Sequence, residues 1–205
     1  MRFIIGSGGH AKVVLDAMQL LYPGEAIVLR DGNFERNGQS LLGHPIFCPE
    51  FDHQMAGQEC HVAIGSNRIR QDLISRANQF GAIIVGIIHP RAQVAGSAVI
   101  GFSCFIAAGA IVAPAANIGK GVIINHNAVV DHDSLINDFA HIGPGATLGG
   151  SVHVGEGSLI GAGANILPGV RVGKHAVVGA GSVVICDIGD RETWVGVPAR
   201  RKVAG

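Results

Sequence analysis

One aliphatic residue recurs at every sixth position through the second half of the chain. Starting at residue 94, sixteen successive positions carry Ile, Leu or Val, and the residue four positions further along is small. The aliphatic positions are Val94, Ile100, Ile106, Val112, Ile118, Ile124, Val130, Ile136, Ile142, Leu148, Val154, Ile160, Ile166, Val172, Val178 and Val184; the small ones begin with Ala98, Cys104, Ala110 and Ala116 and end with Ala176 and Ser182. This pattern is typical of a coil with a triangular section, in which each hexapeptide forms one flat side. We therefore predict a β-helix over residues 92–186, with about five uninterrupted rungs of 18 residues.

The first 88 residues show a different pattern, in which short apolar runs alternate with amphipathic segments. Strands are predicted at residues 2–5, 26–29, 61–64 and 83–88, and helices at residues 11–21 and 66–80. The inward faces of these helices are predicted to be Val14, Leu15 and Met18 in the first, and Ile69, Leu73 and Ile74 in the second. Such alternation is typical of a small, Rossmann-like parallel α/β sheet. We therefore divide the chain into an α/β domain at residues 1–88 and a β-helix domain with a C-terminal tail at residues 89–205.

A glycine-rich loop joins the first predicted strand to the first helix, with the sequence Gly6-Ser7-Gly8-Gly9-His10-Ala11. The amides of such a loop and the helix N-terminus could hold a phosphate. The dinucleotide-binding fingerprint needs a third glycine, and this chain has Ala11 in that place. A phosphate site and a simple tight turn therefore both remain open.

Composition and charge exclude several classes of protein. Hydrophobic residues make up 48% of the chain and charged residues 15%, which indicates a folded protein. The 15 Lys and Arg balance the 15 Asp and Glu, so the chain lacks the basic field that a nucleic-acid or anionic-membrane partner requires. No stretch approaches ~20 apolar residues, and Gly6 interrupts the first apolar run, so we predict neither membrane insertion nor a signal peptide. The four scattered cysteines indicate reduced thiols in a cytoplasmic protein.

The segment Asp131-His132-Asp133 is the only place where two acids flank a histidine. Adjacent carboxylates stabilise an imidazolium and fix the tautomer, which suits a general base. The sequence leaves open whether Asp131 or Asp133 orients the ring. One rung of 18 residues after His132 comes Gly150, which would leave space over the ring, with amides nearby for an oxyanion.

A second histidine, His141, follows His132 by half a rung. Half a turn around a triangular coil places the two on opposite sides of one chain. They can therefore meet only across an interface between subunits, which predicts an oligomer.

Several motifs in a fixed order resemble those of one enzyme family. They are Ile5-Gly6-Ser7-Gly8-Gly9-His10-Ala11-Lys12-Val13-Val14, Ala63-Ile64-Gly65-Ser66-Asn67-Arg68-Ile69-Arg70, Ile88-His89-Pro90, Val130-Asp131-His132-Asp133 and Trp194-Val195-Gly196-Val197-Pro198-Ala199. On these the chain resembles the left-handed β-helix acyltransferases, in particular the nucleotide-amino-sugar N-acetyltransferases (PglD-like) and the related sialic acid O-acetyltransferases (NeuD-like).

The resemblance implies a homotrimer with active sites between subunits, acetyl-CoA bound along the coil, and a nucleotide sugar held by the N-terminal domain. It implies His132 as the general base, Asp133 as the acid that raises its basicity, and His141 as a contact of acetyl-CoA. Many relatives carry Glu in place of Asp133, and two acids where this chain has Arg30-Asp31, so only Asp31 can keep that role.

The remaining predicted contacts fall into two groups, and no metal site is predicted. The substrate-binding residues are Gly8, Gly9, His10, Asp31, Gly65 and Asn125. The cofactor-binding residues, beside His141, are Gly150, Gly161, Ala162, Gly179 and Ala180, where small residues would let the pantetheine arm approach the backbone.

The predicted activity is transfer of acetyl from acetyl-CoA to the 4-amino group of a nucleotide-linked amino sugar, of the UDP-4-amino-4,6-dideoxy-N-acetylhexosamine type, in bacterial glycan biosynthesis. No cysteine lies near the acid–His segment, which favours direct attack over an acyl-enzyme. Three alternatives remain at this stage: O-acetylation of a sialic acid, a zinc carbonic anhydrase on the same coil, and a non-catalytic scaffold. The sequence determines neither the amino sugar, nor the nucleotide, nor the pathway.

Overall fold

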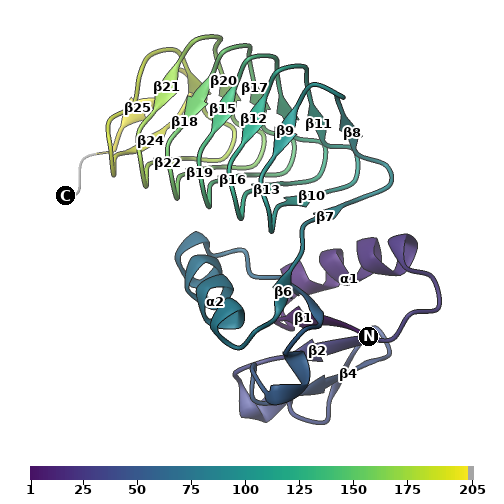
Figure 1. The fold of residues 1–205 in the computed structure, drawn as a ribbon. Coiled ribbons are helices and arrows are strands. Elements are labelled where there is room, and N and C mark those ends of the chain that lie inside the picture. Colours follow the sequence, from purple (N-terminus) through teal and green to yellow (C-terminus); the bar gives the residue numbers. More distant parts are fainter. Residues whose placement is uncertain (203–205) are drawn as a thin grey trace.

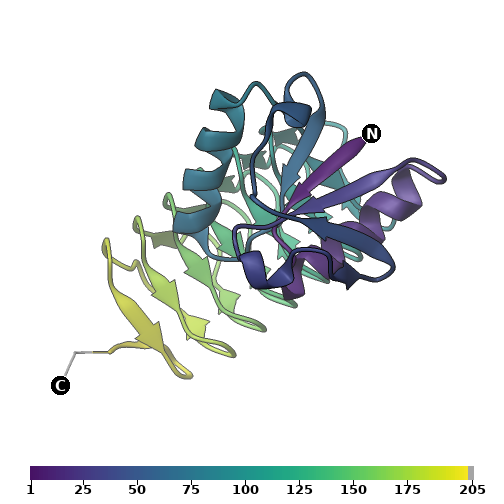
Figure 2. The ribbon, with the colours of Figure 1, turned by 90° about the horizontal axis from the view of Figure 1, so that it is seen from below.

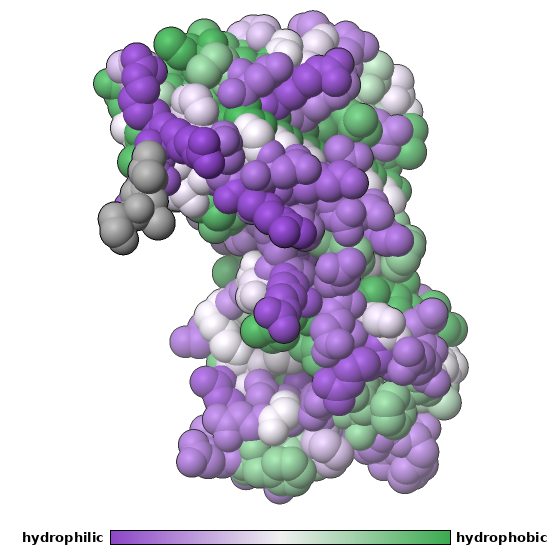
Figure 3. Space-filling model, turned by 90° about the vertical axis from the view of Figure 1, so that its left-hand side faces the viewer, coloured by the Kyte–Doolittle hydropathy of each residue, from purple (hydrophilic) through white to green (hydrophobic). Residues whose placement is uncertain are grey.

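A computed structural model describes residues 1–202 as an α/β domain joined to a stack of coils (Figure 1). The last three residues of the predicted 89–205 domain lie outside the described part. Figure 3 shows the two parts as lobes joined across a narrower waist, with hydrophilic residues over much of the face in view. No helix among the described residues is both long enough and apolar enough to cross a membrane.

The N-terminal domain is built on a six-stranded sheet in the order β3-β4-β2-β1-β5-β6. Its strands are β1 Arg2–Ile5, β2 Ile27–Arg30, β3 Ser40–Leu41, β4 His44–Phe47, β5 Glu59–Val62 and β6 Ile83–Ile84. All pairs are parallel except β3 with β4, and β1 lies between β2 and β5 in the register Ile4↔Leu29 and Ile4↔His61. The carboxyl ends of these three parallel strands therefore meet at one edge, which is where such sheets bind ligands.

Two α-helices pack between this sheet and the coil. They are α1 Gly9–Leu21 and α2 Asn67–Gln79, and two short 3-10 helices, η1 Phe34–Arg36 and η2 His53–Met55, lie in the loops. The buried side of α1 shares an apolar cluster with coil residues Phe105 and Ile123, and Ile74 of α2 shares another with Phe139. Seen from below, the two helices flank the sheet and the coils lie behind (Figure 2).

The inward face of α2 differs from the prediction. Ile69 is 52% exposed, whereas Arg70 is 1% exposed and lies on the buried side with Ile74 and Ala77. The prediction for Ile69 is therefore wrong. A prediction from apolar periodicity never places an arginine on the buried face of a helix. Arg70 can be buried because hydrogen-bond acceptors from distant parts of the chain surround it.

The predicted single strand at residues 83–88 is two strands in different sheets. β6 Ile83–Ile84 pairs with β5 in the N-terminal sheet, and β7 Ile87–Ile88 pairs with β10 Phe105–Ile106 in the coil. Gly86 lies between them, and a Cβ there would lie 3.2 Å from the carbonyl oxygen of Cys104. The coil thus begins at β7, earlier than residue 92, because the apolar run continues across the junction.

The coil consists of three stacks of short strands, which pair in parallel except for β24 with β25 at the end of the first stack. Their bounds are β8 Gln93–Val94, β9 Val99–Ile100, β10 Phe105–Ile106, β11 Ile111–Val112, β12 Asn117–Ile118, β13 Ile123–Ile124, β14 Val129–Val130, β15 Leu135–Ile136, β16 His141–Ile142, β17 Thr147–Leu148, β18 His153–Val154, β19 Leu159–Ile160, β20 Asn165–Ile166, β21 Arg171–Val172, β22 Val177–Val178, β23 Val183–Val184, β24 Thr193–Val195 and β25 Arg200–Arg201. The first stack is β7-β10-β13-β16-β19-β22-β24-β25, the second β8-β11-β14-β17-β20-β23, and the third β9-β12-β15-β18-β21. Pairs such as Ile106↔Ile124 and Ile124↔Ile142 confirm the predicted rung of 18 residues.

The interior of the coil holds the repeating aliphatic and small residues. Every predicted aliphatic position from Ile106 onward is buried, and Val94 and Ile100 are partly buried at the open first rung. Each such side chain contributes roughly 1.5–3 kcal/mol by leaving water. The serines among the small residues are also buried, and their hydroxyls accept backbone bonds from the next rung, as Ser158 does from Ala176 at 2.9 Å. The repeat therefore satisfies both apolar burial and backbone hydrogen bonding.

Candidate active site

His132 lies in the turn between β14 of the second stack and β15 of the third. Its Nδ1 is 2.8 Å from Oδ2 of Asp133, and its backbone N–H donates to Oδ1 of Asp131 at 2.7 Å. Asp133 has a left-handed backbone conformation, with φ of 57°, which an aspartate tolerates better than most residues. The two acids therefore act differently: Asp133 contacts the ring, and Asp131 contacts the backbone.

The His132 ring is accessible and basic. Its side chain is 58% exposed. The hydrogen bond to Asp133, followed by the charge of Asp131, raises the pKa of His132 above its usual 6.5. Because the carboxylate of Asp133 accepts the Nδ1 proton, the neutral ring carries its lone pair on Nε2. Nε2 is then the atom that can take a proton from a substrate.

Gly150 lies over this ring, as the rung period predicts. A Cβ at Gly150 would lie 2.5 Å from both Nε2 and Cε1 of His132. The backbone bond from the Ser151 N–H to the His132 carbonyl, at 2.8 Å, holds the two turns together. Any residue larger than glycine would therefore displace the imidazole.

His141 occupies the opposite side of the coil, on β16 of the first stack. Nδ2 of Asn125 donates to Nε2 of His141 at 3.1 Å, and Oδ1 of Asn125 accepts the His126 N–H at 2.9 Å. Burial, and then the charge of Arg70, lower the pKa of His141 to about 4, while a backbone hydrogen bond to Gly65 acts in the other direction. His141 is thus a neutral imidazole whose Nε2 accepts from Asn125.

The stacks separate the two histidines within one chain. His132 lies at the corner between the second and third stacks, and that corner is opposite the first stack, which carries His141. The predicted placement on opposite sides is therefore what the structure shows. A site that uses both histidines needs two chains.

The glycine loop has the features of an anion site. Gly8 is the N-cap of α1 and Ser66 the N-cap of α2; neither helix has a side-chain cap, and neither has an acid in its first turn. A Cβ at Gly8 or Gly9 would contact nothing within 4 Å, so packing does not require these glycines. They line a cleft of about 440 Å³ with Lys12 and Arg36. Open amides beside two cations favour a phosphate over a simple turn.

Asp31 lies beside this loop at the carboxyl end of β2. Its Oδ2 accepts a hydrogen bond from the Ser7 hydroxyl, and its Oδ1 accepts the Asn33 N–H at 2.8 Å. Asp31 also lines a second cleft, of about 210 Å³, whose wall includes Ile64 and the exposed Ile69. The position of Asp31 is consistent with the predicted substrate contact.

His10 is directed toward the coil. Its ring meets Phe105 edge to face, with centroids 5.2 Å apart, and its Nε2 is buried without a partner among residues 1–202. Burial, and then the neighbouring His61, lower the pKa of His10 to about 3. The structure therefore brings His10 and His61 toward His141, and a direct contact of His10 with substrate stays a prediction.

Comparison with known proteins agrees with both parts of the chain. A family model described as the PglD N-terminal domain matches residues 3–77, and one for the bacterial transferase hexapeptide matches residues 151–186. Perosamine N-acetyltransferase from Caulobacter crescentus, a histidine variant solved with CoA and GDP-perosamine, is 38% identical, with 99% of this chain and 97% of that chain covered and a TM-score of 0.93. The chain belongs to the PglD-type hexapeptide-repeat acetyltransferases.

Two further relatives support this assignment. The acetyltransferase domain of PglB from Neisseria gonorrhoeae, solved with acetyl coenzyme A, is 37% identical, with 98% of each chain covered and a TM-score of 0.91. The curated UDP-N-acetylbacillosamine N-acetyltransferase of Bacillus subtilis is 38% identical over 108 residues, which is 51% of this chain and about half the length of that relative, 50%. The predicted fold class, an α/β domain followed by a left-handed parallel β-helix, is confirmed.

In this PglD-type chain the later coil glycines have a packing role. A Cβ at Gly161 would lie 2.5 Å from the amide nitrogen of Ala180, and one at Gly179 would lie 2.8 Å from Val195. The adjoining Ala162 and Ala180 are exposed at the same corner of successive rungs. The close packing of successive rungs thus requires these two glycines. The alanines have short side chains that leave the backbone accessible, and their contact with a cofactor stays a prediction.

The sequence-based prediction of the site missed Arg70, Asn67 and His61. His61 is fully buried, its Nδ1 donates to the Val85 carbonyl at 2.9 Å, and burial lowers its pKa to about 4. Arg70 and Asn67 fall on one side of α2 with Ile74, so an arginine within an apolar stripe was the signal available. Within residues 1–202, no three metal-ligating side chains converge on one point.

Proposed function

We propose that this protein transfers an acetyl group from acetyl-CoA to the 4-amino group of a nucleotide-linked amino sugar. The observation that carries the proposal is the exposed His132–Asp133 pair beneath Gly150, on a coil joined to a domain with a glycine-loop anion site. PglD-type relatives solved with CoA and GDP-perosamine support this choice of substrate class. The two parts of the chain then divide the work: one binds the nucleotide and the other presents the base.

The chemistry needs one base and no enzyme nucleophile. As the sugar amine attacks the thioester carbonyl, a C–N bond forms, the C–S bond breaks, and Nε2 of His132 takes the amine proton. CoA leaves as the thiolate, and the His132 imidazolium returns the proton to its sulfur to give the free thiol. The Asp133 carboxylate stabilises the imidazolium that results, and holding both substrates in one complex supplies most of the acceleration.

The diphosphate of the sugar nucleotide is assigned to the loop at Gly8 and Gly9, with Asp31 at the ribose or base, Gly65 as a backbone contact of the nucleotide and Asn125 toward the sugar. Acetyl-CoA is assigned to the corner formed by Gly161, Ala162, Gly179 and Ala180, ending near His141 of one subunit and Gly150 of the next. This path is supported by the small, exposed residues at that corner.

The active form proposed is a homotrimer in which His132 of one subunit faces His141 of the next. The separation of these two histidines within one chain supports this assembly. A cytoplasmic location is part of the proposal, and the free, buried thiols of Cys60 and Cys104 support it.

The decisive experiment is a screen of UDP-, GDP- and dTDP-linked 4-amino sugars with acetyl-CoA, in which release of the free CoA thiol is measured. We expect turnover with at least one of these acceptor sugars and its loss in a His132→Asn variant. Turnover confined to sialic acid or CMP-sialic acid would instead identify an O-acetyltransferase. Absence of turnover with every amino sugar would overturn the proposed N-acetylation.

A further inference from the structure

Arg70 is a buried cation at the junction of the two domains. It comes from the second turn of α2 and is 1% exposed. Burial lowers the pKa of its guanidinium to about 10, so the group is still charged at neutral pH. No ion pair is formed by Arg70 with any carboxylate of residues 1–202. A buried charge destabilises the folded protein unless hydrogen bonds satisfy it, so the burial of Arg70 depends on its hydrogen-bond acceptors.

All backbone partners of Arg70 are carbonyl oxygens of loops and turns. On the side of the N-terminal domain, Nη1 donates to the carbonyls of Ile64 at 3.0 Å and Gly65 at 3.2 Å. On the side of the coil, Nε donates to the carbonyl of Gly121 at 2.8 Å, and Nη2 donates to that of Phe139 at 2.9 Å. One planar group therefore fixes the end of β5 to two successive rungs of the coil.

Asn67 extends this connection by one more rung. Its Oδ1 accepts from Nη2 of Arg70 at 2.9 Å, and its Nδ2 donates to the carbonyls of Gly157 at 2.9 Å and Ser158 at 3.1 Å. The start of α2 is thus held to the coil by hydrogen bonds at three rungs.

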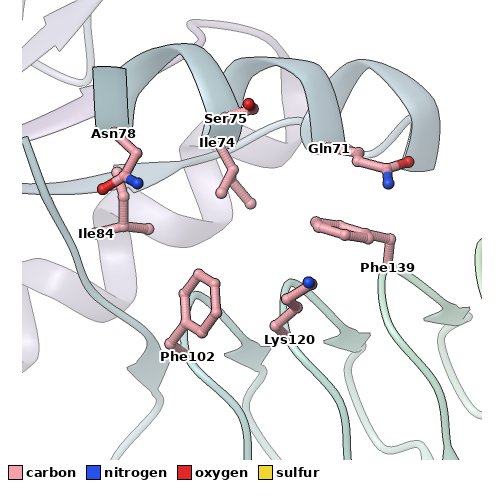
Figure 4. A pocket seen from close by; sticks show the side chains of 8 residues that line it. All are labelled: Gln71, Ile74, Ser75, Asn78, Ile84, Phe102, Lys120 and Phe139. Atoms are coloured by element: carbon pink, nitrogen blue, oxygen red, sulfur yellow. The ribbon is translucent and has the colours of Figure 1, made fainter. Parts of the chain in front are cut away.

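Apolar packing is incomplete beside these bonds. Between α2 and the turns of the coil lies an open cleft of about 440 Å³, lined by Ile74, Phe102, Lys120 and Phe139 among others (Figure 4). Figure 4 shows Phe102 and Lys120 projecting from the turns toward Ile74 across this space. Because the contact of Ile74 with Phe139 fills only part of this junction, the hydrogen bonds of Arg70 also hold the helix to the coil.

The same bonds reach the proposed site. The Gly65 carbonyl accepts from Nη1 of Arg70 at 3.2 Å and lies near His141, whose pKa it raises against the larger effect of burial. We propose that Arg70 is a positioning residue for acetyl transfer: it fixes the Ile64–Gly65 segment of the sugar-nucleotide site to the coil that carries His141. This inference rests on the proposed function, because it gives Gly65 a role in holding the substrate.

The test compares a nucleotide-linked 4-amino sugar with the same free amino sugar in Arg70→Gln. Binding energy from the nucleotide is used to place the amine, so a displaced loop loses that advantage. We expect kcat/KM for the nucleotide-linked sugar to fall about 100-fold, because a 1 Å misplacement can have that effect. The free sugar should lose much less, and KM for acetyl-CoA should change by less than about threefold, since only the acetyl end of its proposed path comes near His141 and the rest lies along Gly161, Ala162, Gly179 and Ala180. Arg70→Lys should recover only part of the loss, because a point charge cannot reach both sides at once.

A matched control is Arg2→Gln, because Arg2 lies at the end of β1 that is remote from the glycine loop. The side chain of Arg2 is mostly buried, forms ion pairs with Glu25 and Glu59, and lines none of the three clefts described above. We expect a lower melting temperature for Arg2→Gln with unchanged kinetic constants. Equal losses for linked and free sugar in Arg70→Gln, or a similar selective loss in Arg2→Gln, would overturn the positioning role.

Two further experiments apply if the Arg70→Gln variant does not fold or if the wild-type protein is inactive. If Arg70→Gln does not fold, Arg70→Lys and Asn67→Ala are compared in the same way. If the wild-type protein acetylates no nucleotide sugar, the proposed function fails by itself, and calorimetric binding of UDP and GDP then tests Arg70 separately. In that case weaker nucleotide binding in the Arg70 variants supports the positioning role, and unchanged binding refutes it.

Discussion

In the turn at residues 131–134, the acids Asp131 and Asp133 contact His132 in different ways. Asp133 meets the ring because its left-handed backbone turns the short carboxylate back toward Nδ1. Asp131 accepts the backbone N–H of His132 and acts on the ring only through its charge. By contrast, burial keeps His10, His61 and His141 neutral, with pKa values of about 3, about 4 and about 4. His132 is therefore the imidazole of these four whose pKa is raised and not lowered.

The pH dependence of kcat/KM tests this assignment. A base must be unprotonated, and the pKa of His132 is raised by Asp133 first and Asp131 second, so activity should rise with pH through a midpoint above 6.5. In Asp133→Asn the midpoint should move to lower pH and the plateau should fall about tenfold to 100-fold, a smaller loss than the 10²–10⁴-fold expected for His132→Asn. Asp131→Asn is the matched control, since an asparagine still accepts the backbone bond, and it should shift the midpoint less. An unchanged limb in Asp133→Asn would show that Asp133 does not govern the ring.

At the scale of elements, the stack of rungs determines what lies next to what. Residues 18 apart are neighbours in space, which is why Ile106, Ile124, Ile142, Ile160 and Val178 form one column. The same rule places Gly150 over His132, and the distance from a Cβ to the ring shows that no methyl group fits there. The active-site turn thus depends on the turn of the next rung.

Gly150→Ala should separate the geometry of the site from the stability of the coil. The new methyl group would lie 2.5 Å from the ring, and the exposed imidazole would rotate away from Asp133 to relieve the contact. We expect kcat to fall at least about tenfold, while the melting temperature stays within a few degrees because the ring, and not the backbone, moves. Gly96→Ala is the control, since a Cβ there meets nothing within 4 Å and the residue is exposed. Equal activity of the two variants would argue against a tight fit of Gly150 on His132.

At the scale of the whole molecule, one chain presents two incomplete halves of the proposed site. The first stack, covered by the N-terminal domain, carries His141, and the opposite corner carries His132. Closed rotational symmetry would bring the corner of one subunit to the first stack of the next and repeat the same site around the ring.

Mixing two inactive variants tests this arrangement. His132→Ala and His141→Ala are each expected to lose most activity alone. After joint refolding, random assembly should restore about a quarter of wild-type activity, because a quarter of the interfaces then combine an intact His132 with an intact His141. Sedimentation equilibrium should give the mass of three chains for every sample. A trimer whose mixture stays inactive would contradict a site shared between subunits.

The sequence alone determined the coil, its rung of 18 residues and the neighbours that follow from it. In a repeat, a spatial neighbour is a fixed number of residues away, so the pattern that buries Ile142 also places Gly150 over His132 and separates His132 from His141. Strands β1, β2 and β5 and helices α1 and α2 were visible for a similar reason, because each carries its own periodicity, whereas the short strands β3 Ser40–Leu41 and β4 His44–Phe47 were not predicted.

Only the tertiary structure decided how the two domains meet. It buried Arg70 in place of Ile69, split the apolar run between β6 and β7, and assigned the ring of His132 to Asp133. It also gathered His10, His61 and His141 around one guanidinium. None of these follows from a local pattern, because the acceptors of Arg70 lie up to about 70 residues away in the chain and a buried charge is stable only where such partners converge.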